Sequence, residues 1–169
     1  LGSCAGIHCD IVTPYLVDLG TDEQKQRWLP GCASGEIVSA IAMTEPGGGS
    51  DLAALKTTAV RDGDEWVING SKTFITNGYS ADLIVTAVRT TPEKGAKGIT
   101  LFGIEATDEG FSRGRKLDKV GQSESDTAEL FFEDVRVGSD RIIGEVDRGF
   151  IYMMERLPQE RLTCAISNI

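Results

Sequence analysis

A glycine run after an apolar stretch is the first part of the sequence able to bind a small molecule. Residues 44–51 read TEPGGGSD and directly follow the apolar residues 38–43. Consecutive glycines let backbone N–H groups approach an anion closely, and Thr44 and Ser50 add hydroxyl groups. The run is neither a Walker loop nor a GxGxxG fingerprint ahead of a helix. By itself it indicates an anion-binding loop or a flexible turn, and the glycines do not decide between the two.

An aromatic residue and a hydroxyl come next along the chain. Residues 72–78 read KTFITNG, which predicts a strand that ends in a turn. Phe74 offers a flat ring on which a heterocycle can stack, and Thr76 offers a hydroxyl that can donate to it. The alternative is a core aromatic and a surface threonine in a hairpin.

A carboxylate with a neighbouring arginine lies near the end of the chain, where residues 157–162 read LPQERL. On an amphipathic helix such a pair is usually solvated and contributes little. If Glu160 instead faces an apolar cleft, burial raises its pKa and suits it to proton abstraction.

Helices and strands must position these residues. Residues 1–36 are predicted to be helical. Pro14 marks the first turn of a helix or a kink in it, and a second helix is expected to begin at a capping box at 21–24 (TDEQ) and to end near Pro30-Gly31. The helical period returns after Gly144, where Pro158 is expected to kink one helix or separate two.

Between these helical stretches the apolar residues alternate. The pattern predicts seven strands, at residues 38–43, 57–60, 66–68, 72–76, 83–88, 99–104 and 128–135. Asp62-Gly63 and Asn69-Gly70 are expected to form hairpin turns, because these pairs tolerate positive φ. The predicted fold class is therefore α+β, with an antiparallel β-barrel or sandwich flanked by helices.

Composition excludes several classes of function. The 169 residues include 17 Lys and Arg against 26 Asp and Glu, and the net charge of −9 would repel nucleic acid and anionic lipid. No apolar run approaches the roughly 18 residues of a membrane span. The four cysteines form no CxxC pair, so we expect no metal site but reduced, mostly buried thiols of an intracellular protein. The chain starts without Met and ends inside an apolar-periodic stretch, so both ends are expected to be cut.

Three segments resemble the acyl-CoA dehydrogenase family in order and spacing: residues 42–51 (AMTEPGGGSD), 68–78 (INGSKTFITNG) and 125–135 (SDTAELFFEDV). Residues 42–46 (AMTEP), Phe74 and residues 157–161 (LPQER) are most similar to its long-chain branch. The resemblance implies three parts of the chain. Residues 1–36 would end an N-terminal helical domain, 37–143 would be a middle β-barrel, and 144–169 would begin a C-terminal helical bundle, so two truncated all-α domains flank the barrel.

The resemblance also implies FAD between the barrel and the bundle. Phe74 takes the place of the family's ring-stacking aromatic residue, often Trp, and Thr76 would hydrogen-bond near flavin N5, which stabilises the reduced ring. Gly49 and Ser50 would lie towards the flavin diphosphate. The other residues implied to contact the cofactor are Ile41, Ala42, Met43, Thr44 and Ile75.

The family reaction removes hydrogen from Cα and Cβ of an acyl-CoA thioester. A carboxylate takes the α-proton, the β-hydrogen leaves as hydride to the flavin, and the electrons pass to an electron-transferring flavoprotein. In the long-chain and isovaleryl branches Glu160 is where the base would be, and Arg161 would orient or polarise it. The remaining residues implied to contact substrate are Ser50, Pro158, Gln159 and Lys97, although Lys97 is equally well read as an ordinary solvated lysine.

The resemblance further implies a homotetramer or dimer, assembled through helices outside this sequence. It implies a location in the cytoplasm, or in the mitochondrial matrix of a eukaryote. Two alternatives remain open: a relative similar to acyl-CoA oxidase, which passes electrons to oxygen, and a non-catalytic relative that binds flavin or CoA esters. As a separate 169-residue piece, the chain is expected to show little or no turnover.

Overall fold

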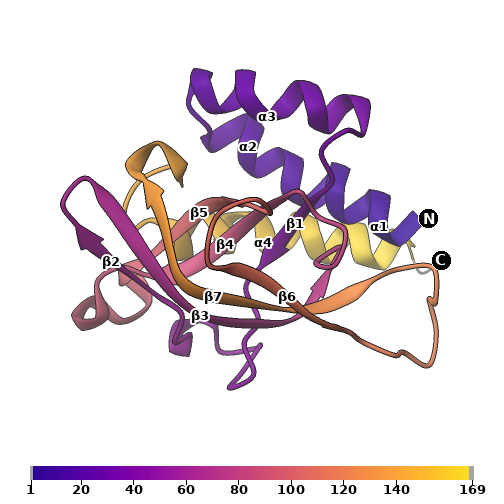
Figure 1. Cartoon of the computed structure of the whole chain (residues 1–169). Coiled ribbons are helices and arrows are strands. Elements are labelled where there is room, and N and C mark those ends of the chain that lie inside the picture. The colour runs from indigo at the N-terminus through magenta and orange to yellow at the C-terminus, as the bar shows by residue number, and fades with distance from the viewer. Residues whose placement is uncertain (1, 168–169) are drawn as a thin grey trace.

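A computed structural model describes residues 2–167 and shows a curled sheet with helices packed against it (Figure 1). The first helical rod is built from α1 (Gly2–Gly6), a π-helical segment (Ile7–Val12) and α2 (Thr13–Leu19). The backbone N–H of Thr13 donates to the carbonyl of His8, five residues back, and the Thr13 hydroxyl donates to the same oxygen at 2.7 Å. The predicted irregularity at Pro14 therefore takes the form of wide helical turns just before it.

Helix α3 (Asp22–Ser34) begins as predicted and ends later than predicted. The Thr21 hydroxyl accepts from the Gln24 N–H, and the Gln24 side chain accepts from the Thr21 N–H, which confirms the capping box. The predicted end at Pro30-Gly31 is wrong, because the helix tolerates Pro30 and continues to Ser34. Gly35 ends it with φ of 82°, a left-handed conformation that glycine adopts at low cost.

The sheet has eight strands in the order β6-β7-β3-β2-β4-β5-β8, with β1 beside β4. Its pairs are antiparallel except for β1 with β4 and the short contact of β2 with β4, which are parallel, so the fully antiparallel prediction is wrong at these two places. The strands are β1 (Ser39–Ala42), β2 (Thr58–Asp62), β3 (Glu65–Thr76), β4 (Leu83–Arg89), β5 (Ile99–Glu105), β6 (Phe111–Lys116), β7 (Thr127–Gly138) and β8 (Ile142–Ile143).

The hairpin predicted at Asn69-Gly70 is absent, because β3 runs through both residues. The Asn69 side chain instead pairs with Asp134 of β7 through two hydrogen bonds of 2.9 Å, where the register shifts by one residue. A Cβ on Gly70 would lie 2.6 Å from the Thr57 hydroxyl, so close packing requires glycine here. Strands β6 and β8 were not predicted, since the first is largely polar and the second has two residues.

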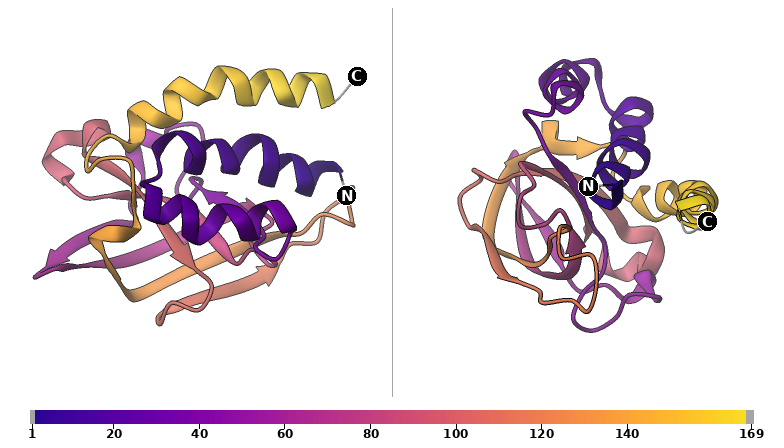
Figure 2. Two further views of the ribbon diagram at one scale, coloured as in Figure 1. Left: turned by 90° about the horizontal axis from the view of Figure 1, so that it is seen from above. Right: turned by 90° about the vertical axis from the view of Figure 1, so that its right-hand side faces the viewer.

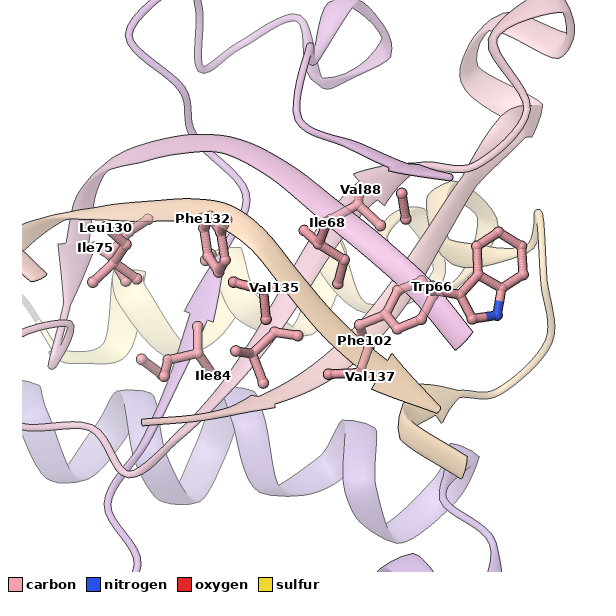
Figure 3. Packing of buried hydrophobic residues seen from close by; sticks show 14 of the residues in the cluster. Trp66, Ile68, Ile75, Ile84, Val88, Phe102, Leu130, Phe132, Val135 and Val137 are labelled. Carbon is pink, nitrogen blue, oxygen red and sulfur yellow. The ribbon is translucent and has the colours of Figure 1, made fainter. Parts of the chain in front are cut away.

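Two apolar clusters fix the layers. The first lies inside the curled sheet, where side chains from β3 and β7 face those from β4 and β5 (Figure 3). Trp66 and Phe102 meet there edge to face, with ring centroids 5.8 Å apart. The second cluster packs the helices on the outer face of β4 and β5, with Tyr15 and Trp28 among its fully buried members.

Helix α4 (Gly149–Ser167) is continuous through Pro158 and runs beside the first helical rod in the opposite direction (Figure 2). Arg156 donates to Asp18 at 2.6 Å, and Tyr15 donates to Glu160 at 3.0 Å, which joins the two helices. None of the helices in residues 2–167 is long and apolar enough to cross a membrane. Of the cysteines, Cys9 and Cys164 are exposed and Cys32 is buried, so the expectation of mostly buried thiols is wrong.

Candidate active site

A cavity of about 700 Å³ lies where the sheet meets the first helical rod and α4. Three parts of the chain line it. The sheet and its connections contribute Ile41, Met43, Thr44, Phe74, Ile75 and Thr76; the helices contribute Gly6, Ile7, Ile11, Glu160, Thr163 and Cys164; and the loop between β6 and β7 contributes Gln122 and Glu124. The cavity therefore combines an apolar wall, an aromatic ring, hydroxyl groups and one half-buried carboxylate.

Seven of the residues predicted to take part in function line this cavity, from three distant segments of the chain. The side chain of Ala42 does not, because alternation along β1 turns it into the sheet core while Ile41 and Met43 face the cavity. Gly49 and Ser50 lie outside the lining, in an exposed loop that begins at Thr44. A Cβ on Gly49 would lie 3.2 Å from the Thr44 side chain, so this loop packs closely against a residue that does line the cavity.

A buried ion pair between Lys72 and Glu45 holds the glycine loop (residues 44–51) against the sheet. Lys72 donates from Nζ to Glu45 Oε1 at 2.8 Å and to the Met43 carbonyl at 3.1 Å. The backbone N–H groups of Lys56 and Thr57 also donate to the Glu45 carboxylate. Consequently one buried network holds both ends of the segment that contains the glycines.

The charge state of this pair follows from its contacts. Burial raises the pKa of Glu45, but the hydrogen bonds from Lys72 and Thr57 and the Lys72 charge outweigh it and leave the pKa below its ordinary value. Burial lowers the pKa of Lys72 to about 8, against the opposing effect of Glu45. Both groups therefore stay charged at neutral pH.

Phe74 is aimed into the cavity by an irregularity in β3. Thr73 and Phe74 lie between the paired positions Lys72–Leu130 and Ile75–Ala128, so β3 has one residue more than β7 there. Such a bulge re-aims a side chain, and Phe74 has φ of 58° and is 67% exposed. The Thr73 N–H donates to the Thr44 carbonyl at 2.9 Å, which sets the bulge beside the start of the glycine loop. The alternative interpretation of Phe74 as a core aromatic is wrong.

Glu160 reaches the cavity from α4 and is held there by Tyr15. The Tyr15 hydroxyl donates to Glu160 Oε1 at 3.0 Å. Burial raises the pKa of Glu160, and the hydrogen bond from Tyr15 and the positive charge of Arg156 offset only part of the increase. Burial and the adjacent carboxylate also raise the pKa of Tyr15, so its phenol stays protonated and donates.

Arg161 is exposed and forms no ion pair with Glu160 in the described structure. Successive residues of a helix point about 100° apart, so the two side chains leave α4 in different directions. Arg156, one turn earlier on the same face, supplies the positive charge that acts on Glu160. Pro158 and Gln159 are exposed as well, and Gln159 lines a separate hollow with Cys9, outside the cavity.

Lys97 is exposed at the end of the connection between β4 and β5, away from the cavity lining. This connection is ordered by Asp147, which accepts from Lys94 at 2.7 Å and from the Thr90 and Thr91 hydroxyls. Among residues 2–167 no three His, Cys, Asp or Glu side chains come together as metal ligands would.

The sequence interpretation missed Tyr15 and Arg156, which act on Glu160, and half of the residues that line the cavity. The lining residues that it missed are Gly6, Ile7, Ile11, Gln122, Glu124, Thr163 and Cys164. Tyr15 recurs at helical spacing with Ile7 and Ile11, a pattern that indicates one face of a helix and no chemical role. Its partner is 145 residues away, and no local pattern carries that information. Gln122 and Glu124 lie in a polar loop without any recognisable spacing.

Comparison with known proteins identifies the relatives of this chain. Residues 40–135 match the family described as acyl-CoA dehydrogenase, middle domain, and residues 1–36 match its N-terminal domain. The mitochondrial long-chain specific acyl-CoA dehydrogenase of Mus musculus is 48% identical over 96% of this chain, and the isovaleryl-CoA dehydrogenase of Solanum tuberosum is 44% identical over 98%. The chain spans 39% and 40% of these two relatives.

A solved structure agrees with this match. The acyl-CoA dehydrogenase from Geobacillus kaustophilus superposes with a TM-score of 0.93 and 58% identity, over 95% of this chain and 43% of that one.

Proposed function

The chain belongs to the acyl-CoA dehydrogenase family, and from this premise we propose that its protein dehydrogenates an acyl-CoA thioester between Cα and Cβ with FAD as oxidant. The observation that carries the proposal is one cavity with Phe74 and the Thr44 and Thr76 hydroxyls on the sheet side and the half-buried Glu160 on the helix side. Glu160 is proposed as the base because burial raises its pKa above that of an ordinary carboxylate.

The residues of the cavity fit a flavin. Phe74 holds an exposed ring in a left-handed backbone conformation, an arrangement that an isoalloxazine stacked on the ring would explain. We assign Ile41, Met43, Ile75 and the two threonines to the walls around that ring, and Ala42 through its backbone alone. Bound FAD would supply the acceptor for the β-hydrogen.

The chain's own residues would perform the remaining steps. Glu160 would accept the α-proton as the Cα–H bond breaks, while the β-hydrogen departs with its electron pair and the Cα–Cβ double bond forms. The apolar wall of Ile7 and Ile11 would exclude water from the carboxylate during this transfer. Exposed backbone N–H groups around Gly49 and Ser50 are proposed to meet phosphate oxygens, and Lys97 to meet a phosphate of CoA.

The division of the chain at residues 36 and 143 is also proposed. A left-handed glycine lies beside each limit, with φ of 82° at Gly35 and 78° at Gly144.

By similarity to the relatives, we propose a fatty acyl substrate, an electron-transferring flavoprotein as acceptor, a homo-oligomer, and a place in the cytoplasm or the mitochondrial matrix.

Anaerobic mixing of the flavin-loaded protein, at the full length its gene encodes, with acyl-CoA esters of different chain length tests the proposal. We expect the flavin to bleach, and Glu160→Gln to slow bleaching by about 100-fold or more. Glu155→Gln, at an exposed position on the same helix, is the control and should leave the rate unchanged. Wild-type bleaching in Glu160→Gln would remove Glu160 from the role of base.

The same protein separates the two alternatives. Rapid reoxidation by air, and slow reoxidation by an electron-transferring flavoprotein, would indicate an oxidase. A flavin spectrum that shifts with acyl-CoA but never bleaches would indicate a binding protein without turnover.

A further inference from the structure

Two helices that are far apart in the sequence meet beside the proposed base. Tyr15 and Asp18 lie on one face of α2, and Glu160 and Arg156 lie on one face of α4, which runs antiparallel to it (Figure 2). Tyr15 donates to Glu160 at 3.0 Å, Arg156 donates to Asp18 at 2.6 Å, and the Arg156 guanidinium stands 5.1 Å from the centre of the Tyr15 ring. The four side chains form one contact between the helices, which we call the α2–α4 clasp.

The two halves of the clasp differ in burial. The Tyr15 side chain is wholly buried, whereas the Asp18 side chain is 57% exposed. An exposed ion pair contributes little to helix docking, while a hydrogen bond to a partly desolvated carboxylate is short, directional and stronger. The buried half is also the half that touches a group lining the cavity.

We propose that Tyr15 is a positioning residue for the Glu160 base: its phenol holds Oε1 and thereby fixes the orientation of the carboxylate toward the substrate. This inference rests on the proposed function, because it assumes that Glu160 takes the α-proton. Tyr15 itself exchanges no proton during the reaction, since it is a donor both before and after Glu160 is protonated. Its effect is to reduce the number of carboxylate orientations available in the resting state.

Other charged or titratable groups near Glu160 could influence its protonation. In the described part of the chain these are Arg156 on α4, Asp18 on α2 through Arg156, and Glu124 and Cys164, which line the same cavity. The effect of Tyr15 must therefore be separated from the effect of the surrounding charge.

The experiment compares Tyr15→Phe with Asp18→Asn in the flavin-loaded protein at its full length. The rate of flavin reduction is followed by stopped flow across pH, over a range of acyl-CoA concentrations that includes saturation. In Tyr15→Phe we expect the acid limb to move up by about one pH unit, because the carboxylate loses a donor. We also expect the plateau rate to fall by about tenfold while KM stays within about twofold, because orientation is lost rather than binding.

Asp18→Asn breaks the exposed half of the clasp and leaves Tyr15 in place. Asp18 pairs with Arg156 and does not itself act on the pKa of Glu160, so we expect the acid limb of Asp18→Asn to stay in place or move down, while that of Tyr15→Phe moves up. As a control, Tyr152→Phe removes the phenol hydroxyl of a tyrosine on α4 that lies beside Arg148 rather than Glu160. Its pH profile should match that of the wild type. If Tyr15→Phe does not fold, 3-fluorotyrosine is placed at position 15, because it keeps the ring and the hydroxyl. Its phenol is a stronger hydrogen-bond donor to the Glu160 carboxylate, so the acid limb of the pH profile should move down.

Several outcomes would overturn the inference. An unchanged Tyr15→Phe profile would do so, as would an Asp18→Asn profile identical to that of Tyr15→Phe, which would reduce the clasp to helix docking. Glu160→Gln is run in parallel. If it bleaches at the wild-type rate, Glu160 is not the base and the inference fails with that assignment, while the proposed dehydrogenation stands. If the wild-type protein itself does not bleach, the proposed function has failed; if Glu160→Gln is inactive while Tyr15→Phe is normal, only the inference has failed.

Discussion

Lys72 Nζ lies 2.8 Å from Glu45 Oε1, and these side chains are 0% and 7% exposed. The pair joins the middle of β3 to the start of the glycine loop. Each partner is satisfied by further contacts, Lys72 through the Met43 carbonyl and Glu45 through two backbone N–H groups. Removal of one charge would leave the other buried without its counterion, and this asymmetry makes the pair sensitive to single substitutions.

Lys72→Met should strongly destabilise the protein. The side chain keeps its apolar stem but loses the ammonium, so the Glu45 carboxylate is left buried with only backbone donors. We expect the free energy of unfolding to fall by about 3–5 kcal/mol, measured by urea denaturation followed by circular dichroism. Flavin affinity should fall as well, because the loop loses its lower anchor.

The double variant Glu45→Gln/Lys72→Met should recover part of that loss. The neutral amide buries no charge, and its single acceptor oxygen keeps one of the two hydrogen bonds from the Lys56 and Thr57 N–H groups. If the double variant is as unstable as Lys72→Met alone, loss of packing around the lysine stem explains the result instead of the unpaired charge.

Gly70→Ala should destabilise the sheet more than Gly63→Ala. A Cβ at Gly70 would lie 2.7 Å from the Thr57 Cα, so β2 and β3 would have to separate. We expect a loss of about 2–4 kcal/mol. Gly63 also has positive φ but open space around it, so alanine there should cost about 1 kcal/mol. Equal losses in thermal denaturation would contradict the steric argument.

Local pattern predicted most of the secondary structure and failed where tertiary contacts decide. The Asn69-Gly70 pair has the composition of a hairpin turn, yet Asp134 and Thr57 hold it inside a continuous strand. β6 is largely polar and exposed, so it has no apolar alternation, and it forms because β7 offers an edge to pair with. The parallel pairing of β1 with β4 depends on chain topology, which period alone does not specify.

The site was predictable in proportion to how local its determinants are. Thr44, Phe74, Thr76 and Glu160 each lie in a short motif, and the structure brings all four to one cavity. The role of Arg161 was implied by the family resemblance, whereas in the structure the positive charge that acts on Glu160 comes from Arg156. Tyr15 required knowledge of which helix packs against α4, and that information lies only in the fold.

In the flavin-free protein, Phe74→Gly should raise the free energy of unfolding. Phe74 has φ of 58° and is 67% exposed, so the phenyl ring contributes little packing while its backbone is strained. Glycine relieves the left-handed conformation, and we expect a gain of about 1 kcal/mol in unfolding free energy. Phe74→Ala removes the same ring but keeps the strain, so it should show no gain. If the Phe74 ring stacks on the cofactor, both variants should bind flavin more weakly. Equal unfolding free energies for Phe74→Gly and Phe74→Ala would contradict the proposal that the backbone at Phe74 is strained.

Glu160→Gln should be more stable than wild type at neutral pH, with a difference that depends on pH. Burial raises the native pKa of Glu160 above its ordinary value of 4.5, whereas the unfolded chain keeps the ordinary value. Between those two values the native state binds more protons than the unfolded state, so the stability of the wild type falls as pH rises through that window. The amide that replaces the carboxylate does not titrate and still accepts from Tyr15, so the variant avoids this loss.

Thermal denaturation of the ligand-free proteins from acid to neutral pH should show curves that converge below pH 4.5 and separate above it. Glu155→Gln, at an exposed position, should show no such separation, and a wild-type advantage at neutral pH would mean that the carboxylate stabilises the fold.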